Sequence, residues 1–382
     1  MIRLLTVIGA RPQIIKAAAI SRAVSNLFSD QIEERILHTG QHYDANMSQV
    51  FFDELGIPAP VYNLGIGSSS HGVQTARMIA GIEGVLTSER FDGIVLYGDT
   101  NSTLAGAVAA SKIHVPIFHV ESGLRSFNMT MPEEVNRIVC DHLSSVCFTP
   151  TQTGFDNLMK EGLMELPVKF KNGKGRLVVN SGDVMYDNSV YYSSFAEKRS
   201  DILARLGVSP NEYILTTIHR PNNTDYPPRL TSIVSTLLDI TERDGITMVL
   251  PMHPRTRNIL ENNIDNVTYH RMKTSPLVRI IPPASFFDII VLEKNARIVM
   301  TDSGGVQKES FFFERPCVIL RPETEWVEIL EHGAGIIADA DPRRIMEAYS
   351  KLINTTPVFP LLFGNAHASE LILETVCDYL NQ

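Results

Sequence analysis

The chain has 382 residues, of which 44% are hydrophobic and 20% charged, with a formal net charge of −9 and a pI near 5.7. The length favours two domains, and the acidic balance argues against a nucleic-acid-binding surface without excluding a phosphorylated ligand. No leader-like start and no run of about 18 apolar residues occurs, so we expect a soluble, cytoplasmic protein without membrane contact.

The first half of the chain alternates short apolar runs with helical patterns. Residues 2–8 form an apolar run that Gly9 ends, and apolar positions then recur at helical spacing. The runs "FDGIVLYGDT", "VPIFHVES" and "SVCFTP" are further predicted strands, with helices over 101–113 and near 135–143 between them. Strands alternating with helices predict a parallel sheet covered on both faces.

The second half repeats this alternation after a polar, glycine-containing stretch at 171–188. "YILTTIHR", "ITMVLPMHP", "ARIVMTDSGG", "CVILR" and "AGIIAD" are predicted strands, with helices over 230–242, 306–313 and 343–352. The predicted fold class is therefore α/β, with two Rossmann-like domains facing a cleft. We expect residues 1–183 and a returning C-terminal helix at 366–382 in the first domain, and 184–365 in the second.

The segment "TDSGGVQKES" is the strongest local signal for a ligand. A strand ends there, and Ser303, Gly304 and Gly305 open a helix whose free N–H groups and dipole favour a diphosphate. Glu309 lies where a ribose diol would be expected, and Arg321 ends the next strand. The alternative is an ordinary serine N-cap followed by flexible glycines.

Other polar residues also follow predicted strands. Arg11 lies in the glycine turn "IGARPQ", which is neither a dinucleotide nor a P-loop motif. Asp99 ends a strand and serves either chemistry or as a helix N-cap, and His219 ends the first strand of the second half. His253 and His42 are weaker candidates, and no two histidines have zinc-pair spacing, so no metal is expected.

The segment "HVESGLRSFNMTMPEEVNR" places acids and Arg125, a candidate ligand contact, directly after a buried strand. Glu121 follows "IFHV" and has no obvious solvated face, whereas Glu134 could simply cap a helix that begins near Pro132. Neighbouring carboxylates in a partly dry site exchange protons readily. Together with Glu133, these acids favour proton transfer or elimination over hydrolysis by an activated serine or cysteine.

These motifs together resemble the non-hydrolysing UDP-N-acetylglucosamine 2-epimerase family, which has the glycosyltransferase-B-type fold. The resemblance rests on "GARPQIIKAA", "TGQHYDANMS", "YGDTNSTLAGA", "HVESGLRS", "MPEEVNR", "TIHR", "TDSGGVQKES" and "LRPETEW", in this order. It implies anti elimination of UDP to a 2-acetamidoglucal and re-addition, without NAD or a catalytic metal, in a homodimer. The family's acid/base residues match Asp99, Glu121, Glu133 and His219, and its UDP contacts match Arg11, Ser303, Gly304, Gly305, Glu309 and Arg321.

Several motifs are more similar to a subgroup acting on UDP-2,3-diacetamido-2,3-dideoxy-glucuronate in surface-polysaccharide pathways. "GARPQ", "HRPNN" and "HPRTR" depart from the pattern of the N-acetylglucosamine enzymes. Arg255 and Arg257 add cations that suit a sugar carboxylate. The substrate is therefore expected to be this uronate or UDP-N-acetylglucosamine, with the acidic sugar preferred.

The family commonly carries a second, activating site for UDP-N-acetylglucosamine. The resemblance assigns Gln41 and His42 to this site, but Asp44 stands where an amide is usual and Pro221 where a cation is common. An acid repels a diphosphate and proline lacks an N–H donor, so we expect no requirement for the activator.

Rival interpretations share the nucleotide-binding signal. A UDP-sugar glycosyltransferase would need an acceptor site, a hydrolysing epimerase would let water trap the intermediate, and a non-enzymatic UDP-sugar sensor would tolerate loss of the acids. The acids are all present, which favours the epimerase.

Overall fold

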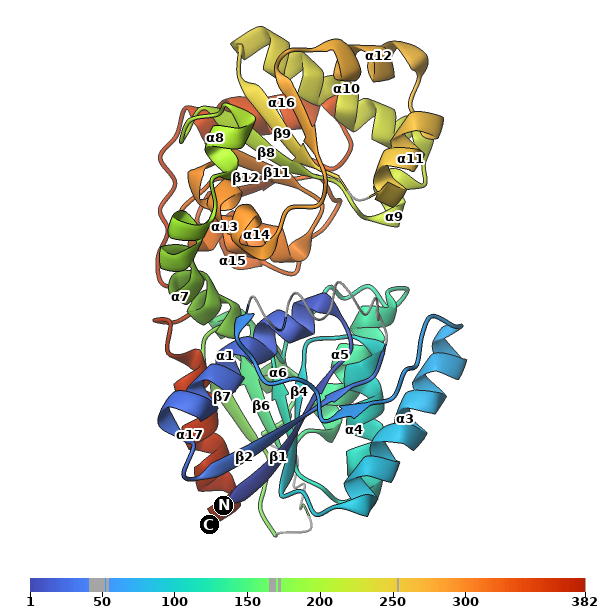
Figure 1. Cartoon of the computed structure of the whole chain (residues 1–382), viewed down its shortest axis with the longest axis vertical. Coiled ribbons are helices and arrows are strands. Elements are labelled where there is room, and N and C mark those ends of the chain that lie inside the picture. Colours follow the sequence, from blue (N-terminus) through green and yellow to red (C-terminus); the bar gives the residue numbers. More distant parts are fainter. Residues whose placement is uncertain (41–51, 53–54, 165–169, 171–172, 253, 382) are drawn as a thin grey trace. The chain divides into compact units, whose positions relative to one another are not determined.

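The computed structural model describes residues 1–40, 52, 55–164, 170, 173–252 and 254–381. The chain divides into two compact units, Met1–Asn188 with Leu361–Gln382, and Ser189–Pro360. Each unit is built on one parallel sheet with helices on its faces (Figure 1). The predicted class of two Rossmann-like α/β domains is confirmed.

The first unit has a seven-stranded sheet in the order β3-β2-β1-β4-β5-β6-β7. Its strands are β1 (Ile2–Ile8), β2 (Ile32–His38), β3 (Tyr62–Asn63), β4 (Gly93–Tyr97), β5 (Ile117–Val120), β6 (Val146–Thr149) and β7 (Leu177–Asn180). Its helices are α1 (Arg11–Leu27), α3 (His71–Ser88), α4 (Asn101–Ile113), α5 (Pro132–Leu143), α6 (Gln152–Lys160) and α17 (Ala368–Asn381). Helix α1 packs beside α17, whereas α3, α4 and α5 pack side by side on the other face (Figure 1).

The second unit has a six-stranded sheet in the order β10-β9-β8-β11-β12-β13. Its strands are β8 (Tyr213–Thr217), β9 (Thr247–Pro251), β10 (Val278–Ile281), β11 (Ile298–Thr301), β12 (Cys317–Ile319) and β13 (Gly335–Ile337). Its helices are α8 (Ile202–Leu206), α9 (Pro221–Thr224), α10 (Pro227–Asp244), α11 (Pro254–Asn263), α12 (Asn266–Thr274), α13 (Phe286–Asn295), α14 (Gly304–Phe312), α15 (Val327–Glu331) and α16 (Pro342–Ile353). Helix α7 (Val184–Arg199) crosses the boundary between the units.

Hydrophobic periodicity explains why these segments fold as they do. Strands β4 and β8 are buried at every position, as expected for parallel strands covered on both faces. Helix α10 instead buries one mainly apolar face, and four of its charged residues, Asp239, Glu242, Arg243 and Asp244, are exposed. It ends at Gly245, whose φ of 63° is the left-handed conformation that glycine adopts most easily.

The strand orders place a topological switch point in each sheet. In the first sheet the chain runs outward in opposite directions from β1 and β4, and in the second it does so from β8 and β11. The loops that leave two such strands diverge, and ligands of doubly wound sheets bind in the resulting crevice at the carboxyl ends of the strands. Arg11 and Asp99 follow β1 and β4, and His219 and Ser303 follow β8 and β11.

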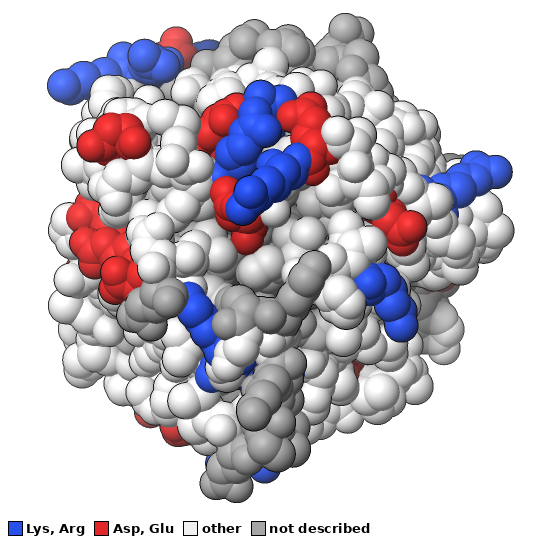
Figure 2. All heavy atoms as spheres, turned by 90° about the horizontal axis from the view of Figure 1, so that it is seen from below, with Lys and Arg blue, Asp and Glu red and all other residues white. Residues whose placement is uncertain are grey.

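Charged side chains lie in small groups of both signs on the face shown in Figure 2, among many uncharged residues. Arg3 pairs with Glu33 at 2.9 Å, and Arg35 with Glu89 at 2.8 Å. Among the helices that the structure describes, none is both long and apolar enough to cross a bilayer.

Candidate functional site

The first switch point is held by a buried glutamine. Gln13 Oε1 accepts the N–H of Gly9 at 2.9 Å, and its Nε2 donates to the carbonyl of Tyr97 at 2.9 Å and to Thr103 Oγ1 at 3.0 Å. One side chain thus ties the β1–α1 turn to the start of α4. Arg11, half-buried, begins α1 at this turn.

Asp99 lies in the turn after β4 and is not the N-cap of α4. The N-cap of α4 is Thr100, whose side chain accepts the N–H of Thr103. The Asp99 carboxylate is about one quarter exposed and binds Arg137, whose Nε and Nη2 lie 3.0 and 2.7 Å from Oδ2. Asn136 also donates to the Asp99 carbonyl at 2.8 Å, so α5 fixes both the backbone and the side chain of this acid.

The two adjacent glutamates at the start of α5 have different environments. Glu134 is 1% exposed and accepts the N–H groups of Ser126 and Phe127, both at 2.9 Å, and Arg137 Nη1 at 2.7 Å. Burial opposes ionisation, but these donors together lower the pKa of Glu134 below its ordinary value. Glu133 is half-buried, and we find no hydrogen bond or ion pair for its carboxylate within the described residues. Glu134 is therefore held by the protein's own groups, whereas no such partners are described for Glu133.

Glu121 lies in the turn after β5 and forms a buried ion pair with Lys16 of α1. Its φ of 70° is left-handed, which is rare for a residue with a side chain and costs on the order of 1–3 kcal/mol. Gly98 also has a positive φ, of 60°, and a methyl group placed there would lie 3.1 Å from Lys16 Nζ and 3.3 Å from Glu121 Oε1. The Lys16–Glu121 pair thus packs directly against the turn that carries Asp99.

Arg125 is buried, and its guanidinium binds other protein groups. Nε and Nη2 donate to Glu161 at 2.7 and 2.8 Å, and Nη1 donates to Asp141 at 2.7 Å and to the Leu124 carbonyl at 2.8 Å. This arrangement favours a structural role over the ligand contact expected from the sequence.

In the second unit, the candidate diphosphate residues converge at the start of α14. Ser303 is the N-cap, and its Oγ accepts the N–H of Val306 at 3.4 Å. Gly304 and Gly305 follow, and a methyl group on Gly305 would lie about 4.0 Å from Glu309 Oε2. The serine cap proposed as the ordinary alternative is present, and it leaves the glycine N–H groups at an exposed helix start.

Arg321 lies beside this helix start. A methyl group on Gly304 would lie 3.6 Å from Arg321 Nη1, and Trp326 Nε1 donates to the Gly304 carbonyl at 3.0 Å. The Arg321 side chain is 6% exposed, and its two Nη atoms lie 3.1 Å from the oxygens of Glu325. Ser303, Gly304, Gly305, Glu309 and Arg321 are thus brought together, with Glu325 holding the arginine in place.

Asp302 joins the two strand ends of the second switch point. Its fully buried carboxylate accepts the N–H of His219 at 2.9 Å, the N–H of Arg220 at 3.0 Å and the side-chain amide of Asn223 at 3.0 Å. The His219 side chain is exposed. Asp302 therefore fixes the loop that presents His219 next to the strand that leads into Ser303.

Three of the predicted site residues, Gln41, His42 and His253, are not among the residues that the structure describes. The structure also shows site residues that the sequence did not predict. Lys16, Arg137, Asp302 and Glu325 are the principal residues that sequence reasoning missed. Lys16 had a signal, since it is a lone charge within the buried apolar stretch of α1. Arg137 lies three and four residues after the two glutamates of α5, which places it on their side of the helix.

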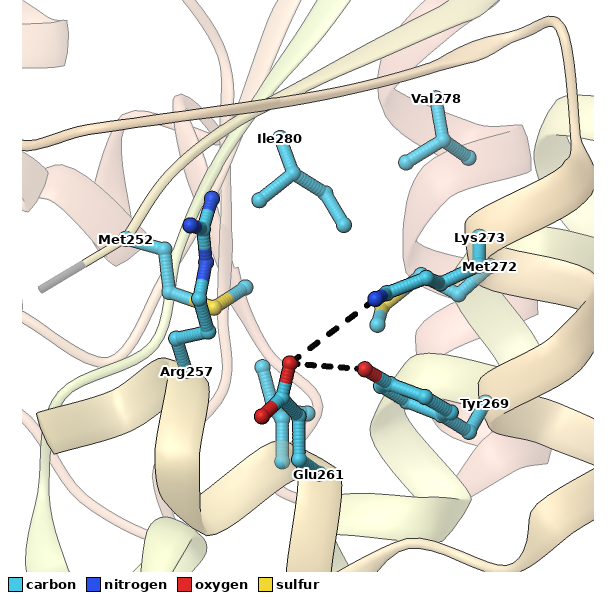
Figure 3. A pocket seen from close by; sticks show the side chains of 9 residues that line it. Met252, Arg257, Glu261, Tyr269, Met272, Lys273, Val278 and Ile280 are labelled. Carbon is cyan, nitrogen blue, oxygen red and sulfur yellow. Dashed lines mark hydrogen bonds and ion pairs between the residues drawn. The ribbon is translucent and has the colours of Figure 1, made fainter. Parts of the chain in front are cut away.

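A pocket of about 320 Å³ lies elsewhere in the second unit, between α11, α12 and β10 (Figure 3). Glu261 Oε1 lies 2.8 Å from Tyr269 Oη and 3.9 Å from Lys273 Nζ at this pocket. None of the strand-end candidates lines it. Arg257, which the sequence linked to an acidic sugar, does line it, whereas the Arg255 side chain lies outside the described part.

Two parallel sheets with the same switch-point topology define a glycosyltransferase-B-type architecture. A crystal structure of a transferase from Siraitia grosvenorii in complex with UDP shares this fold alone, at a TM-score of 0.59 and 12% identity over the full length of both chains. The crystal structure of UDP-N-acetylglucosamine 2-epimerase from Methanocaldococcus jannaschii in complex with UDP-N-acetylglucosamine and UDP is much more similar. Its TM-score is 0.86 at 37% identity, covering 98% of this chain and 99% of that one.

Sequence comparisons agree with this likeness. The family model for UDP-N-acetylglucosamine 2-epimerase matches residues 26–377. UDP-2,3-diacetamido-2,3-dideoxy-D-glucuronate 2-epimerase of Pseudomonas aeruginosa is 45% identical over 373 residues, which are 97% of this chain and 98% of that one. The chain belongs to the UDP-N-acetylglucosamine 2-epimerase family, as its motifs indicated, and is a UDP-sugar 2-epimerase.

Proposed function

We propose that the protein inverts C2 of a UDP-2-acetamido sugar by anti elimination of UDP and its re-addition to a 2-acetamidoglucal. The observation that carries this proposal is the grouping of carboxylates at one edge of the first sheet. Asp99 and Glu121 follow neighbouring strands, and Glu133 begins the helix whose Arg137 binds Asp99.

The chemistry accounts for the number of acids. The C2 proton is barely acidic, so departure of UDP leads and leaves positive charge at C1, which nearby carboxylates stabilise. A base then removes the C2 proton, and inversion requires a proton donor on the opposite face. We assign these acid/base roles to Asp99, Glu121, Glu133 and His219.

The start of α14 is the proposed binding site of the UDP diphosphate. Its free N–H groups and helix dipole attract anions, and the adjacent Arg321 adds a positive charge. Glu309, one turn further along, is assigned to the ribose hydroxyls. Arg11 is assigned to UDP from its place in the first switch point. Holding UDP after elimination keeps it available for re-addition.

The proposed preferred substrate is UDP-2,3-diacetamido-2,3-dideoxy-glucuronate, with UDP-N-acetylglucosamine as the alternative. The greater identity to the Pseudomonas aeruginosa enzyme, 45% against 37% for the Methanocaldococcus jannaschii one, supports this order. We further propose a homodimer that serves surface-polysaccharide biosynthesis and needs no UDP-N-acetylglucosamine as activator.

The test is proton NMR of the purified protein with each sugar, alone and together. Inversion at C2 of the diacetamido uronate at the higher rate, unchanged when UDP-N-acetylglucosamine is added, is the expected result. Faster turnover of UDP-N-acetylglucosamine with a sigmoidal dependence on its concentration would overturn the substrate and activator assignments. No inversion of either sugar would count against the reaction itself.

A further inference from the structure

A buried histidine lies beneath the two turns that carry Asp99 and Glu121. His119 belongs to β5 and is fully buried, as is Asp141 of α5. His119 Nδ1 lies 2.7 Å from Asp141 Oδ1, and Nε2 lies 2.8 Å from the carbonyl oxygen of Gly98. Both ring nitrogens therefore contact an oxygen, and neither is open to a substrate.

The partners of these two nitrogens determine their protonation. A backbone carbonyl can only accept, so Nε2 carries a proton toward Gly98. Asp141 Oδ2 accepts Arg125 Nη1 at 2.7 Å and the N–H of Gly123 at 3.2 Å, which is the environment of an ionised carboxylate. Nδ1 therefore donates as well, and the ring is an imidazolium.

The surrounding groups favour this charged form. Burial alone lowers the pKa of His119, but Cys140 and Asp141 raise it well above the ordinary value. Burial raises the pKa of Asp141, yet its partners, led by His119, leave it below the ordinary value. Arg125 binds the carboxylate of Glu161 through two hydrogen bonds. Asp141 thus binds both His119 and Arg125, and Arg125 in turn binds Glu161, so each of these charges has a partner of opposite sign.

This cluster binds the backbone of the two turns that carry Asp99 and Glu121, and both turns contain left-handed residues. Gly98 has a φ of 60° and directly precedes Asp99, and its carbonyl is the one that His119 binds. Glu121 has a φ of 70° and Gly123 a φ of 79°, and the Gly123 N–H is bound by Asp141. A left-handed residue with a side chain, such as Glu121, persists only when neighbouring groups define it, and here the cluster binds the backbone on either side of the site.

We propose that His119 is a positioning residue for the elimination, acting through Gly98 on the Asp99 carboxylate and through Asp141 on the Glu121 turn. The inference rests on the proposed function, because it takes Asp99 and Glu121 as the acids that touch the substrate. His119 itself does not exchange protons with the sugar.

Two substitutions separate the two contacts of the ring. The amide of His119→Asn can reproduce the Nδ1 donation to Asp141 but does not reach Gly98, whereas that of His119→Gln reaches toward Gly98 in place of Nε2. The variants are compared by kcat, KM, UDP affinity from calorimetry and melting temperature. We expect both variants to lose at least ten-fold in kcat, because each breaks one of the two contacts of the ring, with KM and UDP affinity within about two-fold of the parent. Full kcat in either variant, or a loss of UDP affinity as large as the loss of kcat, would overturn the proposal.

A measurement on the unaltered protein covers the case in which neither variant folds. Nitrogen-15 NMR of the histidine-labelled enzyme at pH 8 should show one imidazolium with protons on both ring nitrogens, which His119→Gln lacks if it folds. A spectrum with only neutral rings would refute the assignment. If the parent inverted no UDP-sugar but showed the imidazolium, the proposed function would fail while the buried scaffold stood.

Discussion

Glu133 and Glu134 are a natural matched pair, because identical side chains one residue apart have different surroundings. We consider Glu133→Gln and Glu134→Gln. The Glu134 carboxylate accepts two backbone N–H groups and Arg137, and an amide keeps only one accepting oxygen and turns N–H donors toward the others. Losing one to two charge-assisted hydrogen bonds in a buried site costs about 3 kcal/mol.

Glu134→Gln should therefore mainly lower stability, and Glu133→Gln should mainly lower kcat. Glu134→Gln should lower the free energy of unfolding by about 3 kcal/mol and the melting temperature by roughly 6–12 °C. Glu133→Gln should cost under about 1 kcal/mol, the scale of a helix-dipole contribution, but reduce kcat by about 10²–10⁴-fold if Glu133 transfers a proton. Thermal unfolding and NMR turnover assays measure both. A Glu133→Gln enzyme with full kcat, or a Glu134→Gln protein with the parent melting temperature, would refute the reasoning.

Three further outcomes follow from the described contacts. The folded-state pKa of Glu134 is lowered from 4.5, so its stabilisation is present above pH 4.5 and is lost as the pH falls through the folded-state pKa. The free energies of unfolding of the parent and of Glu134→Gln, measured by urea unfolding from pH 7 to pH 3, should therefore converge at low pH. A difference that stays constant over this range would contradict the assignment. Arg321→Ala should weaken UDP binding by about 1.5–3 kcal/mol in calorimetry and lower the melting temperature, because Glu325 loses its buried cationic partner. Adding Glu325→Gln should restore the melting temperature but not the affinity for UDP. A double variant with restored UDP affinity would argue against a UDP contact of Arg321. Asp302→Asn should lower both kcat and the melting temperature, because an amide has only one accepting oxygen for the donors that the carboxylate binds, among them the N–H of His219. An unchanged kcat would show that the loop carrying His219 does not contribute to catalysis.

The strands that sequence predicted are those with uninterrupted apolar runs. Strand β2 went unpredicted because Glu33, Glu34 and Arg35 occupy its middle, and their partners are distant in sequence: Glu33 pairs with Arg3, and Thr6 donates to Glu34 at 2.5 Å. Strand β7 lies inside the polar stretch at 171–188, which separates the two halves of the predicted pattern. The burial of β2 and β7 depends on the strands beside them, so it cannot be inferred from these short polar segments alone.

The residues of the candidate site likewise differ in how far the sequence predicts them. Residues at strand ends could be predicted, because the switch-point rule places carboxyl ends of parallel strands together whatever the side-chain details. Their supporting partners could not. Asp302 binds the backbone of His219 across 83 positions of sequence, and His119 reaches Gly98 across 21. Such bonds depend on rotamers and strand register, for which a single sequence carries no periodic signal.

Deuterium incorporation tests the central claim most directly. The enzyme is incubated with UDP-2,3-diacetamido-2,3-dideoxy-glucuronate in deuterated water, and the C2 position of the isolated product is analysed by NMR and mass spectrometry. Elimination followed by re-addition with protonation from an exchangeable carboxylic acid predicts an inverted product that carries one deuterium at C2. An inverted product with only protium at C2 after full conversion would contradict the proposed mechanism.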